Sequence, residues 1–207
     1  MNQYHKIQTV YLRDPDNNYK TLLEGQFSKP EFEYLSDNDW VLTEKVDGTN
    51  IRVMYDQSDI QFGGKTDRAQ LPSPLVNRLN ERFLPQQDVF QTFTAPVCLY
   101  GEGYGPKIQK GGGNYRPDQD FVLFDVKVGD WWLKREDVEE VATMFNIDIV
   151  PIIVVCDLIQ AVDIVKHGIL STWGNFPAEG VVARPKVELK ARNGERIITK
   201  IKTNDFK

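Results

Sequence analysis

The sequence contains little cysteine and little histidine. Its two cysteines, Cys98 and Cys156, both lie in apolar strand-like runs, no Cys-x-x-Cys pair occurs, and the histidines are limited to His5 and His167. This scarcity argues against a structural zinc site. A chain with so few thiols fits the reducing cytoplasm most simply.

Long apolar runs are missing as well. The longest, residues 147–156, is interrupted by Asp148 and Pro151, so no stretch reaches membrane-spanning length. The N-terminal residues lack the apolar segment of a signal peptide. We therefore expect no membrane association, and nothing in the sequence indicates an obligate protein partner.

Positive charge is not in excess either. Against 25 Lys and Arg residues stand 30 Asp and Glu residues, which gives a net charge of -5. This balance argues against a protein that coats nucleic acid non-specifically, although it permits a local basic groove. Basic residues do gather in residues 184–207 and in the glycine-rich residues 107–116. A solvated face that balances acidic surface elsewhere is the plain alternative.

Short β-type runs dominate the chain. Runs rich in branched or aromatic residues predict strands at residues 6–12, 40–43, 50–55, 59–62, 97–102, 121–128, 149–155, 180–184 and 196–202. Helical spacing predicts helices at residues 30–35, 74–83, 135–145 and 157–170, with Ser73 and Asp157 as N-caps. Because strands outnumber helices and do not alternate with them, we expect an α+β fold of mainly antiparallel sheets, in a single domain over residues 1–207.

The most informative segment is EKVDGTNIR, residues 44–52. A lysine followed two residues later by Asp-Gly has the spacing of a nucleophilic lysine at a tight turn. Because Asp47-Gly48 is a turn signal between two expected strands, the sequence predicts a hairpin with Lys45 at its mouth. Lysine attacks only after it loses its proton, which nearby cations or desolvation favour. A surface lysine beside a hairpin turn is the alternative.

Two further segments can bind a nucleoside. In YGEG, residues 100–103, glycines flank Glu102 and let a ligand approach the backbone, while the carboxylate can accept hydrogen bonds from ribose hydroxyls. In FVLFDV, residues 121–126, Phe121 and Phe124 lie on opposite faces of a strand, and the one that faces a cleft can stack on a nucleobase. An exposed loop acid and an ordinary core strand are the alternatives.

Two more segments carry charge that suits phosphates. In AEGVV, residues 178–182, Glu179 precedes an apolar strand and can hold a divalent cation. In TKIK, residues 199–202, Lys200 and Lys202 alternate onto the same face, where they repel each other unless an anion lies between them. A polyphosphate would satisfy both lysines, and their charge would favour a neutral Lys45. The solvent face of an edge strand is the alternative.

Taken together, KVDG, YGEG, FVLFDV, AEGVV and TKIK resemble, in order, motifs I, III, IIIa, IV and V of the covalent nucleotidyltransferase superfamily. That superfamily contains ATP-dependent RNA ligases, DNA ligases and mRNA capping enzymes. The TEKVDGTN form of the first motif is most similar to RNA ligases of the T4 RNA ligase 2 type and their phage relatives. The resemblance implies a nucleotidyltransferase (ATP-grasp-like) fold and an ATP-dependent RNA ligase of RNA repair; a phage-encoded enzyme would act in the host cytoplasm.

The resemblance also implies a role for each matching residue. Lys45 would attack the α-phosphate of ATP, expel pyrophosphate and hold AMP through a phosphoramidate. Phe124, rather than Phe121, would stack on adenine, and Glu179 would lie near a catalytic Mg²⁺ or Mn²⁺. The other expected nucleotide-binding residues are Glu44, Asp47, Asn50, Lys65, Glu102, Lys200 and Lys202. Lys65 stands where the family often has arginine, and nearby Arg68 could share its role.

The later steps of the family reaction imply an RNA substrate. Family members pass AMP to an RNA 5′-phosphate and then join a 3′-hydroxyl to it with loss of AMP, so the expected partner is RNA with such ends. Charge and flexibility around the glycine-rich loop indicate a contact with the RNA backbone. The candidate RNA contacts are Arg68, Lys107, Lys110 and Arg116.

The chain departs from the family pattern at its C-terminal end. Five residues follow Lys202, so we expect neither the OB-fold domain of DNA ligases and capping enzymes nor the helical domain of T4-type RNA ligases. Two alternatives follow: a minimal ATP-dependent DNA ligase, and a non-catalytic nucleotide- or RNA-binding module on the same fold. The presence of Lys45 together with its matching partners argues against the module, because a module needs no nucleophile.

Overall fold

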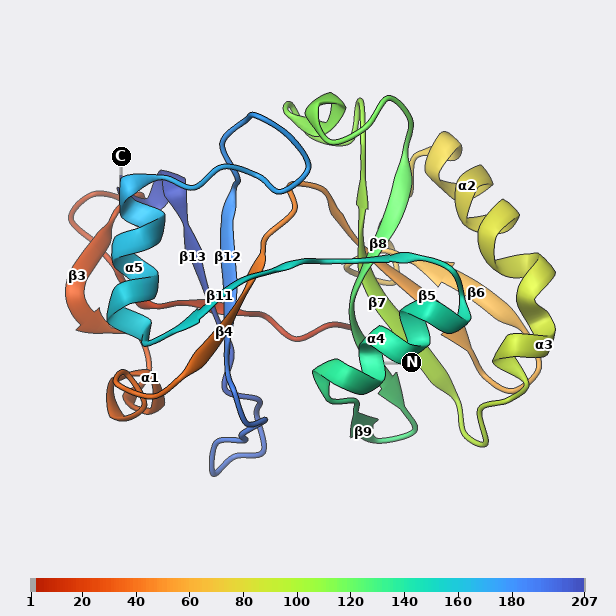
Figure 1. Cartoon of the computed structure of the whole chain (residues 1–207), viewed down its shortest axis with the longest axis horizontal. Coiled ribbons are helices and arrows are strands. Elements are labelled where there is room, and N and C mark those ends of the chain that lie inside the picture. The colour runs from red at the N-terminus through yellow and green to blue at the C-terminus, as the bar shows by residue number, and fades with distance from the viewer. Residues whose placement is uncertain (1–2, 207) are drawn as a thin grey trace. The chain divides into compact units, whose positions relative to one another are not determined.

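In the computed structural model, which describes residues 3–206, the chain forms two compact units (Figure 1). Unit 1 consists of residues 3–5 and Asp47–Val150, and unit 2 consists of Lys6–Val46 and residues 151–206. Each unit is built around one main sheet and has its own apolar core.

The sheet of unit 1 runs in the order β10 (Asp148–Ile149), β8 (Asp120–Val128), β7 (Val97–Tyr104), β5 (Thr49–Tyr55) and β6 (Ile60–Gly63), with β9 (Trp131–Trp132) paired to β8. The helices of this unit are α2 (Ser73–Phe83), α3 (Gln87–Phe90) and α4 (Arg135–Met144), with the 3₁₀ turns η1 (Leu84–Gln86) and η2 (Gly112–Asn114).

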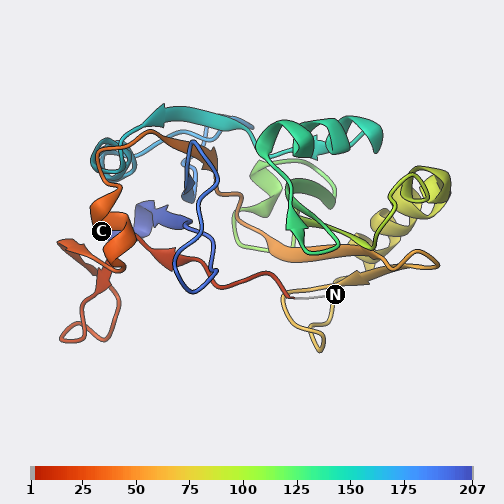
Figure 2. The ribbon, with the colours of Figure 1, turned by 90° about the horizontal axis from the view of Figure 1, so that it is seen from below.

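One face of this sheet carries the core of unit 1. Strand alternation turns Ile51 of β5 to this face, where Phe83 of α2 and Val138 of α4 cover it. Figure 2 shows α2 and α4, yellow and green, above the same side of the sheet. Each large side chain that is fully buried in this way contributes about 1.5–3 kcal/mol, which fixes the face that is turned inward. The opposite face carries Asn50 of β5 and Glu102 of β7.

The sheet of unit 2 runs in the order β1 (Gln8–Thr9), β13 (Thr199–Lys202), β12 (Gly180–Pro185), β4 (Trp40–Glu44) and β11 (Ile152–Cys156). A small second sheet joins β2 (Tyr11–Arg13) and β3 (Leu22–Phe27), and the helices are α1 (Pro30–Tyr34), α5 (Leu158–His167) and the 3₁₀ turn η3 (Thr203–Phe206). The core packs Leu42, Val181 and Ile201 of the sheet with Leu158 and Val165 of α5.

Antiparallel pairing prevails in both units. The short pairs β1–β13 and β10–β8 are parallel, and the other described strand pairs are antiparallel. With few helices beside these sheets, the structure confirms the expected α+β class.

The expected hairpin around Lys45 is wrong. β4 pairs with β11 and β12 in unit 2, whereas β5 pairs with β6 and β7 in unit 1. The apolar faces of the two strands belong to different cores, because Leu42 and Ile51 are both fully buried but in separate clusters. The single strand expected at residues 149–155 is likewise divided: β10 ends before Pro151 and β11 begins after it.

The two predicted helix caps have different outcomes. Asp157 is the N-cap of α5, and its Oδ1 accepts a hydrogen bond from the Gln160 N–H at 2.8 Å, as expected. The Ser73 cap is wrong, because Ser73 is already helical and Pro72 takes the N-cap position without a side-chain hydrogen bond. Pro74 at the first turn lacks an N–H and so reduces the need for a capping side chain.

Both cysteines are free and buried. Burial raises the pKa of the Cys98 thiol to about 11, so it stays protonated and unreactive at neutral pH. None of the helices in residues 3–206 has the length and the apolar content that a membrane span requires.

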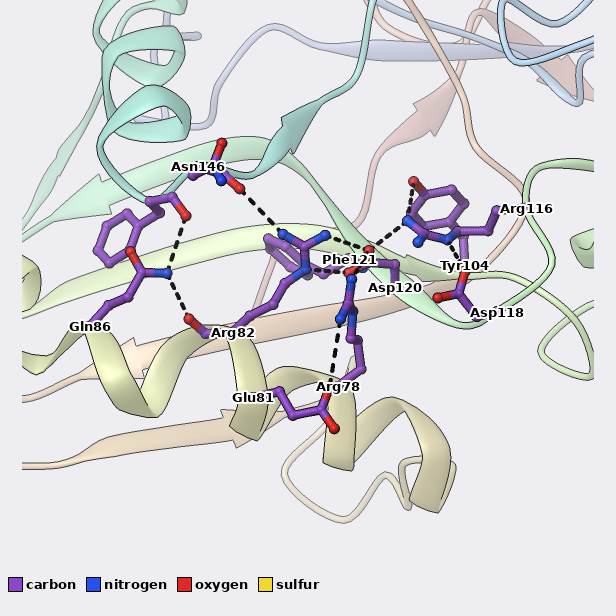
Figure 3. A network of polar contacts seen from close by, with 11 residues as sticks. Arg78, Glu81, Arg82, Gln86, Tyr104, Arg116, Asp118, Asp120, Phe121 and Asn146 are labelled. Carbon is purple, nitrogen blue, oxygen red and sulfur yellow. Dashed lines mark hydrogen bonds and ion pairs between the residues drawn. The ribbon is translucent and has the colours of Figure 1, made fainter.

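Three arginines converge on one buried carboxylate in unit 1 (Figure 3). Asp120 is fully buried at the start of β8, and Arg82 of α2 donates to both of its oxygens at 2.6 Å. Arg78 of α2 and Arg116 of the loop before β8 also donate to it. Burial alone would raise the pKa of Asp120, but the hydrogen bonds from Arg82 and Arg78 outweigh it and hold the pKa below its usual 3.8. The cluster therefore ties α2 and residues 105–119 to the sheet.

We expect Asp120→Asn to lower the free energy of unfolding at neutral pH by about 3 kcal/mol, because three arginines lose their shared counter-charge. Folding lowers the pKa of Asp120, so its contribution is present above the unfolded pKa and is lost as the pH falls through the lower folded pKa, below 3.8. Urea unfolding from neutral to strongly acidic pH measures both effects.

The matched control is Asp118→Asn, which removes an exposed partner of Arg116 and should have a much smaller effect. A stability of Asp120→Asn equal to that of the parent at neutral pH would contradict this account of the cluster.

Candidate active site

One face of the unit 2 sheet carries three lysines. Lys200 and Lys202 lie on the face of β13 that is turned away from the core, as their alternation predicted. Lys45 directly follows β4, and its backbone N–H donates to the carbonyl of Gly180 in β12 at 3.0 Å. Because β12 lies between β4 and β13, three segments that are distant in sequence lie on adjacent strands.

Glu179 joins two of these lysines. Its Oε2 accepts from Lys45 Nζ at 2.6 Å, and its Oε1 accepts from Lys202 Nζ at 2.7 Å. The side chain of Glu179 is 12% exposed, while those of Lys45 and Lys202 are 25% and 32% exposed. These are short, charge-assisted contacts. The carboxylate is shielded from solvent, whereas the two lysine side chains are partly exposed.

The third lysine, Lys200, has a perturbed pKa. Its burial and the ammonium groups of Lys45 and Lys202 lower the pKa of Lys200. Glu179 pairs with Lys45 and Lys202, whereas the carboxylate that acts on Lys200 is that of Asp205, which is itself paired with Arg13. The excess positive charge suits an anionic ligand with several charged oxygens, as expected for a polyphosphate.

Glu44 does not join this cluster. Strand alternation turns its side chain from the lysine face, and the side chain is almost fully buried. Its Oε2 accepts from the backbone N–H and from the hydroxyl of Thr172, each at 2.8 Å. Glu44 thus holds the segment around Thr172 against the end of β4.

In unit 1, Asn50 of β5 lies opposite Glu102 of β7, on the face turned away from the core. Glu102 is half-buried. Asn50 Oδ1 is buried and accepts no hydrogen bond from the described residues. Because such an oxygen costs about 1–3 kcal/mol when it stays unsatisfied, this position fits a ligand that donates a hydrogen bond.

The two candidate aromatics of β8 have different surroundings. Phe121 is fully buried in the core of unit 1, whereas Phe124 lies outside that core at a register shift between β7 and β8. The ring centroid of Tyr4 lies 5.0 Å from that of Phe124 and 5.1 Å from that of Tyr100. Because Tyr100 and Glu102 alternate onto the same face of β7, Phe124 lies on the face that carries Glu102.

Tyr4 is a residue that sequence reasoning missed. Its hydroxyl donates to the fully buried carboxylate of Asp125 at 2.8 Å, and its ring also contacts Trp132. The sequence offers no signal for these contacts, because a lone tyrosine near an N-terminus has no periodicity or motif. Residues 3–5 thus support the strand that carries Phe124.

Lys65 and Arg68 are both exposed, in the segment after β6. The almost fully buried Arg52 holds this segment, because it donates to the Gly64 carbonyl at 2.9 Å and to the carboxylate of Asp67 at 2.7 Å. Arg52 was also missed, since an arginine within a strand gives no sign of its partner.

The candidate RNA contacts in the glycine-rich loop fall into two kinds. Lys107 and Lys110 are exposed. Arg116 is half-buried and donates to both Asp118 and Asp120, so its guanidinium already serves the Asp120 cluster.

Comparisons with known proteins identify the family and the fold of this chain. A family model described as RNA ligase matches residues 38–202. The apo form of a mutant RNA ligase from Naegleria gruberi aligns over 99% of this chain and 56% of its own, at 18% identity and a TM-score of 0.71. A mutant of that enzyme with ATP and Mn aligns over 86% and 52%, at 21% identity and a TM-score of 0.68.

The same Naegleria gruberi enzyme with PPi aligns over 100% of this chain and 57% of its own, at 18% identity and a TM-score of 0.71. At these identities the likeness shows a shared fold. This chain spans only 52–57% of the length of these relatives. A search of curated proteins finds no match.

Proposed function

The chain belongs to the RNA ligase family, and on this premise we propose that it is an ATP-dependent RNA ligase that carries AMP on Lys45. The observation that carries the proposal is that Lys45, Lys200 and Lys202 lie together on one face of the unit 2 sheet, where Glu179 binds Lys45 and Lys202. The Naegleria gruberi relatives that contain ATP and Mn, or PPi, support ATP and a divalent ion as cofactors.

In the proposed first step, the Nζ lone pair of Lys45 attacks the α-phosphorus of ATP. A P–N bond forms, the bond from the α-phosphorus to its bridging oxygen breaks, and pyrophosphate leaves with that electron pair. Lys45 must first leave its ion pair with Glu179 and lose a proton. The charges of Lys200 and Lys202 would neutralise the phosphates. Displacement at phosphorus depends mainly on such positioning and charge neutralisation.

A divalent ion fits this site if Glu179 and the phosphates of ATP hold it together. Mg²⁺ is commonly held by one or two carboxylates together with substrate phosphates. Glu179 suits that role, because its two oxygens already attract two cationic groups. Among residues 3–206 no three His, Cys, Asp or Glu side chains form a metal cage, so the phosphates would supply further ligands. When bound, the ion would neutralise phosphate charge.

Residues of unit 1 would bind the nucleoside. We assign adenine stacking to Phe124, ribose binding to Glu102, and orientation of the lysine or nucleotide to Asp47 and Asn50. Lys65 would supply a further positive charge, and Glu44 would act only through Thr172. Because the family match at residues 38–202 includes residues of both units, we propose that the two units form one nucleotidyltransferase domain.

The later steps would transfer AMP to an RNA 5′-phosphate and join a 3′-hydroxyl to it with release of AMP. The exposed Arg68, Lys107 and Lys110 are the proposed contacts with the RNA backbone. Arg116, expected from the sequence as a fourth contact, would instead hold the loop, because its guanidinium binds Asp118 and Asp120. The expectation of a cytoplasmic enzyme, phage-encoded or not, stays a prediction from the sequence.

Sealing assays separate this proposal from its alternatives. The substrates are nicked duplexes with either RNA or DNA on the 3′-hydroxyl side, incubated with ATP and Mg²⁺. An RNA ligase should seal the RNA nick faster, whereas equal or faster sealing of the all-DNA nick would favour a minimal DNA ligase. A non-catalytic binding module would seal neither nick and would gain no AMP.

A further inference from the structure

The loop of residues 105–119 holds the turn that follows the proposed nucleophile. The backbone N–H of Asp47 donates to the hydroxyl of Tyr115 at 3.1 Å. The side-chain amide of Gln109 donates to the carbonyl of Gly48 at 3.0 Å. Two side chains of one loop therefore bind two backbone groups of the Asp47–Gly48 turn, which begins two residues after Lys45.

The loop itself is closely packed. A Cβ atom at Gly112 would overlap the carbonyl oxygen of Gly105, so the glycine permits a close approach of two backbone segments. Gln119 donates to the Pro106 carbonyl at 2.8 Å and closes the base of the loop. A compact surface loop whose ends meet is an Ω-loop, a type that often carries function. Gly112 is thus needed for the close packing of this loop.

Tyr115 has a fixed position within this loop. Its side chain is almost fully buried, and its ring meets the ring of Tyr104 edge-on, with 5.9 Å between centroids. The guanidinium of Arg116 lies 5.6 Å from the centroid of Tyr104 and donates to Asp120 (Figure 3). The Tyr115 hydroxyl is thus held through Tyr104 and Arg116 by the Asp120 cluster of unit 1.

We propose that Tyr115 and Gln109 are positioning residues for the adenylation of Lys45. By fixing the Asp47–Gly48 turn, they limit the orientations of the chain that leads to the nucleophile. This inference rests on the proposed function, because it assumes that Lys45 reacts with ATP. Fixing the approach of a nucleophile has a large effect on rate, since small misplacements from an attack geometry lower it strongly.

The effect should fall on the rate and not on nucleotide affinity. Tyr115 and Gln109 bind backbone atoms of the turn and contribute no group to the proposed nucleotide contacts. Loss of either hydrogen bond should therefore lower the rate of P–N bond formation at saturating ATP, while the ATP concentration for half-maximal rate stays nearly constant. A variant that is partly unfolded would instead show a smaller fraction of chains that gain AMP, at an unchanged rate.

The test follows AMP gain on the whole chain by intact mass in single turnovers, over a range of ATP concentrations. Tyr115→Phe removes the hydroxyl and keeps the ring packing, and Gln109→Ala removes an exposed side chain. We expect each variant to lower the maximal rate about 10-fold and to change the half-saturating ATP concentration by less than about 2-fold. The temperature of unfolding should stay close to that of the parent.

Asn114→Ala is the matched control, an exposed residue of the same loop whose side chain makes no hydrogen bond to the turn. It should react like the parent. Parent-like maximal rates in both variants, an equal loss in the control, or a rate restored by more ATP would each overturn the inference. A parent chain that gains no AMP would instead overturn the proposed function.

Discussion

Replacement of Glu179 by glutamine is expected to slow formation of the Lys45–AMP bond by at least about 100-fold. The carboxylate binds Lys45 at 2.6 Å and Lys202 at 2.7 Å, one on each oxygen. Glutamine keeps the size but loses the charge and one acceptor, so at most one ammonium group keeps a comparable partner. Lys45 and Lys202 would then lose their shared counter-charge, and both the nucleophile and a phosphate-binding lysine would lose their positions.

Single-turnover AMP gain at saturating ATP and Mg²⁺ measures this effect. The matched control is Glu24→Gln, which removes an exposed carboxylate bound to Lys166 in the same unit. The control should adenylate at the parental rate, because an exposed ion pair contributes little. A Glu179→Gln variant that reacts as fast as the control would show that Glu179 does not organise the lysines.

A second large effect is expected from Gly180→Ala. Gly180 has φ +153°, and a Cβ atom there would overlap the carbonyl oxygen of Ile201 and lie 2.8 Å from the Cα of Lys202. Gly180 is also paired in register with Lys202, and its carbonyl binds the backbone N–H of Lys45. The alanine must therefore separate β12 from β13 at the point where the lysine cluster is built. We expect a loss of about 3 kcal/mol in the free energy of unfolding and a strong loss of AMP gain.

Gly194→Ala separates the steric effect from the backbone effect. Gly194 also has a positive φ, +83°, but a Cβ atom there would meet nothing within 4 Å. Its free energy of unfolding should fall by only about 1–2 kcal/mol, because the alanine has to adopt an unfavourable backbone conformation. The variant should still adenylate. If the two alanine variants were equally stable and equally active, the close approach at Gly180 would have no importance for the site.

Local signals in the sequence account for much of the fold. Branched and aromatic runs mark the positions of most strands, and Asp157 caps α5 as its residue type predicts. Alternation also places Lys200 and Lys202 on one face, because Ile201 between them has to be buried. These features depend on neighbours within a few residues, so a single sequence contains them.

Partners that are distant in the chain could not be predicted. A turn signal at Asp47-Gly48 says that the chain bends, but not that the strands on either side belong to different sheets. Likewise, nothing near Arg52 or Tyr115 in the sequence indicates the groups that they bind. Such contacts depend on which cores the strands join, and this is decided by packing over the whole chain.

The central claim is that Lys45 forms a covalent bond with AMP. Its most direct test is the intact mass of the chain after incubation with ATP and Mg²⁺, compared with that of Lys45→Ala. Both proteins must first be shown to be folded, and the parent to be free of AMP already bound. We expect an acid-labile gain of one AMP in the parent and none in the variant. No gain in the parent, or an equal gain in Lys45→Ala, would contradict the assignment of Lys45 as the nucleophile.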